Sequence, residues 1–164
     1  MRFVILTNPV SGGLSAEQKR AALSAAAEVL DAEISGLDTG SAEEFRRCAR
    51  QLAGRCDVLV AAGGDGTFSD LINSIDTSHT PVGFLPLGTG NALRHALRYQ
   101  GDLVRVARRI KKGRIHSYDL IDCDGKRRAL TASVGIEGTT IQRWHRRRSG
   151  GGGGFKSYFL AFLE

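Results

Sequence analysis

Residues 57–67 read Asp-Val-Leu-Val-Ala-Ala-Gly-Gly-Asp-Gly-Thr, an apolar run that ends in three glycines around one carboxylate. Glycine costs backbone entropy, so this cluster indicates a sharp turn or a close approach of the backbone to a ligand. Residues 68–75 continue with apolar side chains at positions 68, 71, 72 and 75, which is helical spacing. A strand, a glycine turn and a helix together point N–H groups at an anion, most often a phosphate. An ordinary tight turn is the alternative, but one or two glycines would suffice for it.

Two further predicted strands end in the same way. Residues 81–86 read as a short strand, and the loop 87–91 (Leu-Gly-Thr-Gly-Asn) leads from it to a helical segment at 92–97. Residues 2–7 read as a strand that runs into residues 8–13 (Asn-Pro-Val-Ser-Gly-Gly). Ligands bind at the carboxyl ends of the strands in open parallel sheets, so we expect the three loops to contribute to one site.

The first hundred residues alternate between predicted strands and helices. Ser15 and Gln18 have the spacing of a capping box for a helix to about residue 31, and Ser41 and Glu44 repeat it for a helix to about residue 53. Strands are predicted near 32–37, 57–62 and 81–86, and further helices at 67–75 and 102–110. This order predicts an α/β fold with a doubly wound, mostly parallel sheet.

The pattern changes after residue 113. Residues 116–123 and 128–134 read as two strands joined by Asp124-Gly125, which is a hairpin turn signal. No helical segment separates them, so an antiparallel element begins here. The sequence therefore predicts a nucleotide-binding α/β domain at residues 1–113 and an incomplete, β-rich second domain at residues 114–164.

The composition is that of a globular protein. Of 164 residues, 41% are hydrophobic, and no apolar run approaches the roughly 20 residues that span a bilayer. The first residues lack the pattern of a signal peptide. Three widely spaced cysteines, with no metal-like pairing, are typical of reduced thiols. We therefore expect a cytoplasmic protein, with peripheral contact at the inner face of the membrane as a further expectation.

Two segments near the end of the chain predict surface contacts. Residues 143–148 (Arg-Trp-His-Arg-Arg-Arg) suit an anionic membrane interface, with a solvated basic loop as the alternative. Nucleic acid binding is not expected, because only one aromatic residue is interleaved and no recognition motif is present. Residues 155–163 place five large apolar side chains on one helical face. Such a face needs cover, so we expect a homodimer through this helix first and membrane contact second.

The three loops resemble those of the diacylglycerol kinase catalytic domain family, which includes sphingosine kinases and bacterial lipid kinases. The family's Asn-Pro-x-Ser-Gly start, Gly-Gly-Asp-Gly-Thr turn and Pro-x-Gly-Thr-x-Asn turn match residues 8–12, 63–67 and 86–91. The resemblance covers residues 2–140 and is clearest before residue 100. NAD kinases and phosphofructokinases share a similar glycine–aspartate turn, so their fold is the one expected here.

This resemblance implies an ATP-dependent lipid kinase that transfers the γ-phosphate of ATP, with Mg²⁺, to a hydroxyl of diacylglycerol or a sphingoid-type lipid. The family's general base lies in the C-terminal half, which this sequence does not contain, so we expect the chain alone to be inactive. The alternatives are a non-catalytic nucleotide-binding or regulatory module and a soluble-substrate kinase related to NAD kinases.

The candidate site residues follow from the glycine turns and the resemblance together. Asp65 and Asp119 are assigned to catalysis. Asp65 would place magnesium or the phosphates, with capping of its turn as the alternative. Asp119 matches an acidic family position near the interdomain cleft, and a structural aspartate at a strand edge is its alternative. No metal site made by the protein alone is predicted. The nucleotide contacts are assigned to Asn8, Thr39, Gly63, Gly64, Asp65, Gly66, Thr67, Gly88, Thr89, Gly90 and Asn91.

The chain departs from the family pattern at four positions. Ser69-Asp70 stands where Asn-Glu is common in the family. Ala92 follows Asn91 where an aspartate is common, and this Asn-Ala-Leu ending resembles that of sphingosine kinases. Gly13 stands where many bacterial members have a lysine. Loss of that cation weakens the neutralisation of phosphate charge unless another Arg or Lys replaces it.

Overall fold

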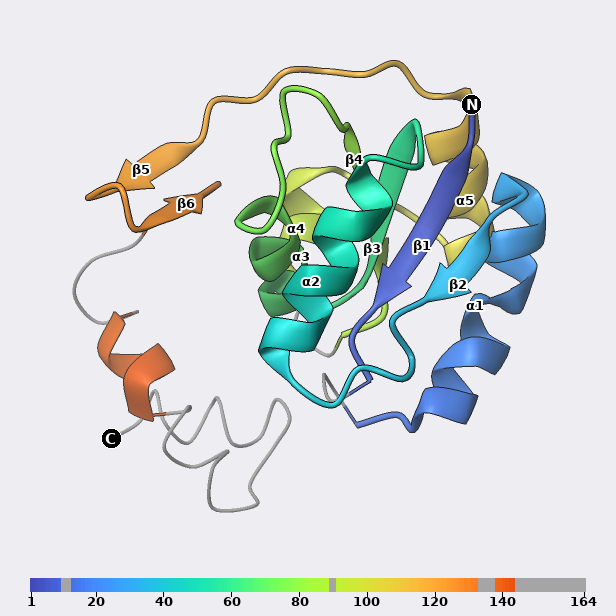
Figure 1. The fold of residues 1–164 in the computed structure, drawn as a ribbon, viewed down its shortest axis with the longest axis horizontal. Coiled ribbons are helices and arrows are strands. Elements are labelled where there is room, and N and C mark those ends of the chain that lie inside the picture. The colour runs from blue at the N-terminus through green and yellow to red at the C-terminus, as the bar shows by residue number, and fades with distance from the viewer. Residues whose placement is uncertain (10–12, 89–90, 133–137, 144–164) are drawn as a thin grey trace. The chain divides into compact units, whose positions relative to one another are not determined.

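The computed structural model describes residues 1–9, 13–88, 91–132 and 138–143 (Figure 1). The chain divides into two compact units, Met1–Tyr118 and Asp119–Glu164. The domain limits predicted from the sequence, 1–113 and 114–164, stay a prediction.

The first unit is built on a parallel sheet of four strands in the order β2-β1-β3-β4. The strands are β1 (Phe3–Thr7), β2 (Glu33–Ser35), β3 (Val58–Gly63) and β4 (Val82–Pro86). In the register of the sheet, the last residue of β1 pairs with Ala62, and Gly63 pairs with the last residue of β4. The three longer strands therefore end at one edge of the sheet, as the sequence predicted (Figure 1).

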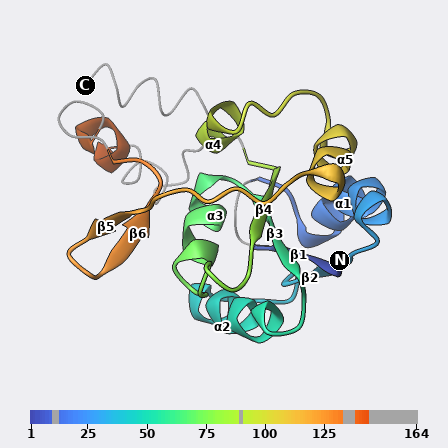
Figure 2. The same cartoon turned by 90° about the horizontal axis from the view of Figure 1, so that it is seen from above.

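Helices cover both faces of this sheet (Figure 2). On one face α1 (Ala16–Leu30) packs beside α5 (Leu103–Lys112), and on the other α2 (Ala42–Ala53) packs beside α3 (Asp65–Ile72). The short helix α4 (Ala92–Ala96) follows β4. The fold is therefore α/β and doubly wound, which confirms the predicted class.

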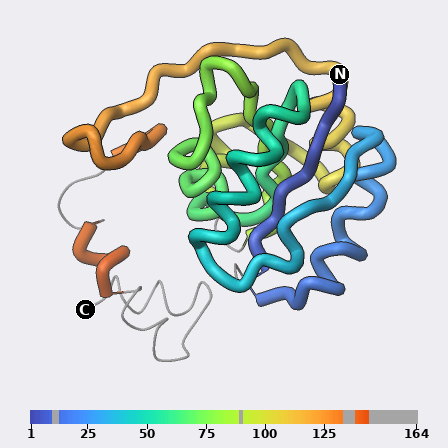
Figure 3. The backbone as a smooth tube through the Cα atoms, in the orientation of Figure 1, coloured from blue at the N-terminus to red at the C-terminus, as the bar shows by residue number. Residues whose placement is uncertain are grey.

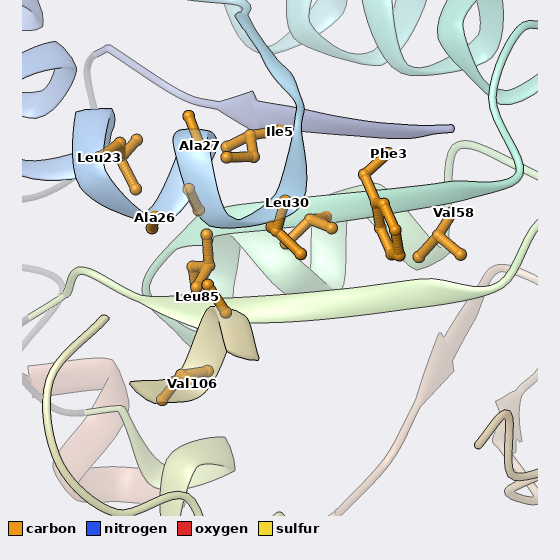
Figure 4. Packing of buried hydrophobic residues seen from close by; sticks show 12 residues of the cluster. Phe3, Ile5, Leu23, Ala26, Ala27, Leu30, Val58, Leu85 and Val106 are labelled. Atoms are coloured by element: carbon orange, nitrogen blue, oxygen red, sulfur yellow. The ribbon is translucent and has the colours of Figure 1, made fainter. Parts of the chain in front are cut away.

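The central strands are buried on both sides, so alternate residues belong to different clusters. Phe3 and Ile5 of β1 pack with Leu23, Leu30 and Val106 on the α1–α5 side (Figure 4). Their neighbours on β1 join α2 and α3 on the other side. Continuous apolar runs, rather than alternating ones, are the pattern of parallel strands covered by helices on both faces.

The two predicted capping boxes have different outcomes. At α1, the Ser15 hydroxyl accepts from the Gln18 N–H, and the Gln18 side chain accepts from the Ser15 N–H, which completes the box. At α2, the Ser41 hydroxyl accepts from the Glu44 N–H, but the Glu44 carboxylate accepts from Gly40 instead, at 2.6 Å. Ser41 is extended, with a φ of −145°, and the N–H that meets the carboxylate belongs to the preceding residue. The second box is therefore incomplete.

Helix α3 differs from its predicted range of 67–75. It begins at Asp65, because Gly64 takes the extended N-cap conformation with φ −95° and ψ −175°. It ends at Ile72, where a turn closes with the Ser74 N–H donating to the Leu71 carbonyl. The glycine turn is consequently shorter than predicted, and its second half forms the first turn of the helix.

The second unit begins with the predicted hairpin. Strands β5 (Ile121–Cys123) and β6 (Arg127–Ala129) pair antiparallel, and the turn residues Asp124 and Gly125 have φ values of 55° and 65°. Both strands are shorter than predicted, because the described pairing extends only from 121 to 129.

Residues beyond the hairpin are described only in part. Residues 138–143 are helical. Of the predicted basic cluster only Arg143 is described, and the predicted helix at 155–163 lies outside the described residues. Among the helices that are described, none is long and apolar enough to cross a membrane.

The three thiols should differ in reactivity. Burial raises the pKa of the half-buried Cys48 and Cys56 thiols, whereas Cys123 is exposed. Since the thiolate is the reactive form, we expect iodoacetamide at pH 8 to modify Cys123 first. Mass spectrometry of timed samples measures the order. In urea the three should react alike, and fast native modification of Cys48 or Cys56 would contradict the fold.

Candidate active site

Two glycine turns lie against each other at the carboxyl edge of the sheet. The N–H groups of Leu87 and Gly88 both donate to the Gly63 carbonyl, at 2.9 and 3.1 Å. A Cβ atom on Gly88 would lie 2.5 Å from the Cα atom of Gly64, a distance at which the backbone must shift. The close approach of the two loops therefore requires glycine at position 88. From the sequence, the glycines of these loops were expected to serve a sharp turn or contact with a ligand.

Glycine is also required at position 63, for a different steric reason. A Cβ atom at this position would lie 2.5 Å from the Thr67 hydroxyl oxygen. Thr67 is buried, and its hydroxyl has no hydrogen-bond partner within the described ranges. The Thr67 side chain thus fills the space over the end of β3.

Asp65 contacts the neighbouring loop rather than its own turn. Its two carboxylate oxygens accept hydrogen bonds from the N–H groups of Ala92 and Leu93, at 2.9 and 2.8 Å. These N–H groups belong to the first turn of α4, which has no side-chain cap of its own. The carboxylate therefore caps a helix that begins 27 residues later in the chain, and it connects the β3 loop to the β4 loop.

Asn91 closes the β4 loop from within. Its side-chain oxygen accepts from the Gly88 N–H at 3.1 Å, and its amide nitrogen donates to the Gly88 carbonyl. The residue itself has a φ of 48°, a left-handed conformation that asparagine tolerates better than most residues. Thr89 and Gly90, which were also predicted to contact the nucleotide, lie outside the described residues.

The first turn of α3 is the part of this edge that is suited to an anion. The first intrahelical bond runs from the Phe68 N–H to the Gly64 carbonyl. The N–H groups of Asp65, Gly66 and Thr67 precede it and have no partner inside the helix. No atom of the described residues lies within 4 Å of a Cβ placed on Gly66. Packing among these residues therefore does not explain the glycine, and the space that a side chain at position 66 would fill is open among the described residues.

Lys19 is a site feature that the sequence reasoning missed. Its ammonium donates to the carbonyls of Asn8 and Pro9, at 2.7 and 2.6 Å, and the residue is only 3% exposed. No carboxylate of the described part of the chain pairs with it, and burial lowers its pKa. A signal was present, because Lys19 falls on the buried stripe of α1 with Leu23 and Leu30. The cation holds the first loop by its backbone.

Of the remaining predicted site residues, Asn8 and Thr39 belong to the first unit and Asp119 to the second. Asn8 is buried at the end of β1, next to the β3 loop in the sheet order. The Thr39 hydroxyl donates to the Gly36 carbonyl at 2.8 Å and closes the turn after β2. Asp119 is exposed and belongs to the second unit, so the first unit brings together the other described residues without it.

A metal site made by the protein alone is not found within the described residues. No group of three or more His, Cys, Asp or Glu side chains lies close enough to hold an ion. This agrees with the donor chemistry of the edge, which consists mainly of backbone N–H groups and one carboxylate that is already bonded to two of them.

A family model matches most of this chain. Residues 2–123 match the model described as the diacylglycerol kinase catalytic domain. The match includes strands β1, β3 and β4 and the three loops that follow them, so it covers the edge of the sheet described above.

Curated relatives carry the names of lipid kinases. A diacylglycerol kinase of Staphylococcus saprophyticus is 36% identical over 74 residues, which is 44% of this chain and 24% of the relative. Sphingoid long chain base kinase 4 of Schizosaccharomyces pombe is 28% identical over 152 residues, 82% of this chain and 32% of the relative. Probable diacylglycerol kinase 3 of Caenorhabditis elegans is 33% identical over 135 residues, 74% of this chain and 16% of the relative.

A solved structure shares the fold. A putative diacylglycerol kinase from Bacillus anthracis superposes with a TM-score of 0.60 at 19% identity, covering 73% of this chain and 44% of that one. This chain thus spans less than half of the length of the proteins it matches.

Loss of the Asp65 carboxylate should destabilise the first unit. Asp65→Ala leaves two N–H groups of α4 uncapped, and we expect about 0.5–2 kcal/mol less stability in urea unfolding, the usual range for a lost cap. Asp65→Asn keeps one acceptor oxygen and should lose less. A matched change at another cap, Asp102→Ala at α5, gives the reference value. Unchanged stability of Asp65→Ala would contradict the capping role.

Burial of Lys19 should appear in the pH dependence of stability. Because its folded pKa lies below the unfolded value of 10.5, the unfolded chain binds more protons between these two pKa values. Wild type should therefore gain stability relative to Lys19→Met as the pH rises through that window toward 10.5. Urea unfolding from pH 7 to 10.5 measures the difference, in which titrations common to both proteins cancel. Parallel profiles would show that the ammonium is solvated.

Proposed function

The chain belongs to the family of the diacylglycerol kinase catalytic domain, and from this premise we propose that it supplies the nucleotide-binding half of an ATP-dependent lipid kinase. The reaction transfers the γ-phosphate of ATP to a lipid hydroxyl. The chain covers 16 to 32% of the length of the three curated relatives named above, so the activity of the whole protein is part of the proposal.

The observation that supports nucleotide binding most directly is the open first turn of α3. Three backbone N–H groups, those of Asp65, Gly66 and Thr67, lie there without intrahelical partners. The positive end of the helix dipole adds to their attraction for phosphate oxygens. The contact between Gly64 and Gly88 holds the β4 loop beside this turn, so that a second loop borders the same space.

Phosphoryl transfer depends on positioning and charge neutralisation more than on covalent chemistry. We propose that Asp65 acts mainly by position, because both of its oxygens already hold the N-terminus of α4. Magnesium is usually held by one or two carboxylates together with substrate phosphates. Because the Asp65 oxygens are already engaged, the ion would enter as Mg-ATP, with most of its ligands coming from phosphate and water.

The acceptor is proposed from the names of the relatives. Relatives are called diacylglycerol kinases and a sphingoid base kinase, so a diacylglycerol or sphingoid-type lipid is the proposed acceptor class. Asp119 keeps its proposed catalytic role on the resemblance alone. Membrane contact and dimerisation through residues 143–148 and 155–163 remain proposals from the sequence.

A single methyl group tests the phosphate site. Gly66→Ala fills the open space beside the α3 N–H groups, and we expect at least tenfold weaker binding of Mg-ATP by calorimetry, or about 1.4 kcal/mol. The fold should not suffer, since alanine in a helix is favoured over glycine by up to about 1 kcal/mol.

Gly54→Ala is the matched control. Gly54 ends α2 with a φ of −80°, and no described atom lies within 4 Å of a Cβ there. It should bind Mg-ATP like wild type. Equal binding by all three proteins would place the nucleotide elsewhere, and absence of binding by wild type would refute the proposed function itself.

A further inference from the structure

Within residues 1–114, the positive charge is concentrated in one segment. Residues 92–114 contain eight Lys and Arg and one Asp, a formal charge of +7, whereas residues 1–91 contain seven Lys and Arg and eleven Asp and Glu, a formal charge of −4. The basic segment forms α4, α5 and the turns beside them. Most of the basic side chains of this segment therefore lie on helices and on the turns beside them.

The outward side of α5 consists of basic side chains. Val106 and Ala107 are buried against the sheet and α1, whereas Arg105, Arg108 and Lys112 are exposed. Positions separated by three and by four residues lie on one side of a helix, so these three cations form a single stripe. The helix contains no acidic residue that would neutralise them.

Other cations of α5 are engaged within the unit. Arg109 lies over the Tyr99 ring, 5.2 Å from its centre, and Lys111 donates to a backbone carbonyl of α1. Among the residues that the structure describes, the Arg108 and Lys112 side chains have neither a hydrogen bond nor an ion pair. Their charges are therefore available to an external anion.

Two exposed apolar side chains follow α5 in the chain. Ile115 and Tyr118 are 62% and 66% exposed and belong to the same unit. Both residues follow the end of α5 at Lys112. Figure 3 shows the backbone path of the segment that leaves this helix. Cations beside exposed aliphatic and aromatic side chains are typical of surfaces that bind membranes, where charge meets the headgroups and apolar groups enter the interface.

We propose that the α5 face, defined as Arg105, Arg108 and Lys112 with the adjoining Ile115 and Tyr118, docks on an anionic lipid bilayer. The proposal rests on the proposed lipid acceptor, because a kinase that phosphorylates a membrane lipid must work at a bilayer. Charge complementarity selects anionic over neutral membranes. This face differs from the segments at 143–148 and 155–163 from which the sequence predicted membrane contact.

Vesicle binding of the full chain tests the proposal without ATP. Arg108→Gln/Lys112→Gln removes the two unengaged charges, and each cation near an anionic surface changes the partition coefficient about fivefold. We therefore expect about 25-fold weaker binding to phosphatidylglycerol–phosphatidylcholine vesicles at low salt. The matched control, Arg47→Gln/Arg55→Gln, has the same net charge and changes two exposed arginines in and just after α2. It should bind like wild type.

Further measurements identify which ligand the α5 face binds. Wild type should ignore pure phosphatidylcholine vesicles, and Ile115→Ser/Tyr118→Ser should weaken the binding to anionic vesicles that persists at high salt. Equal losses in both double variants, or wild type that ignores anionic vesicles, would overturn the proposal. Tighter binding to a duplex oligonucleotide, lost in Arg108→Gln/Lys112→Gln, would assign the face to nucleic acid instead. Calorimetry with Mg-ATP reports on the nucleotide site separately, so the two proposals can fail independently.

Discussion

The backbone of Gly88 lies so close to that of Gly64 that a methyl group on Gly88 would be 2.5 Å from the Gly64 Cα atom. This approach places the loops after β3 and β4 in direct contact at one edge of the sheet. Two N–H groups of the β4 loop also donate to the Gly63 carbonyl. The Asp65 carboxylate accepts two further hydrogen bonds from the first turn of α4. The open first turn of α3 is bordered by a second loop only because this contact exists, so the proposed nucleotide site depends on it.

Charged side chains in this region hold the backbone. The Asp65 carboxylate binds N–H groups of α4, and the Lys19 ammonium binds carbonyls of the first loop. Burying an ammonium group that no described carboxylate pairs with is costly. The two hydrogen bonds to the carbonyls offset this cost and hold the loop at the end of β1. The surface that would meet a nucleotide is consequently built mainly from backbone N–H groups.

Much of the fold could be predicted from local patterns in the sequence. The continuous apolar runs identified the parallel strands, Ser15 and Gln18 identified the start of α1, and Asp124-Gly125 identified the hairpin. Contacts between distant segments could not be predicted in this way. Asp65 and the N-terminus of α4 are separated by 27 residues, and neither position alone reveals the bond. The early start of α3 depends on the extended conformation of Gly64, which residue spacing does not specify.

The central claim is that phosphate binds at the first turn of α3, and backbone amide shifts test it most directly. In a titration of the ¹⁵N-labelled chain with Mg-ATP, the account predicts that the largest shifts occur at the amides of Asp65, Gly66 and Thr67. Adenosine, which lacks phosphate, should leave these three amides nearly unchanged. If Mg-ATP shifts other amides strongly while those of the α3 turn stay in place, the glycine turn is structural and the account is wrong.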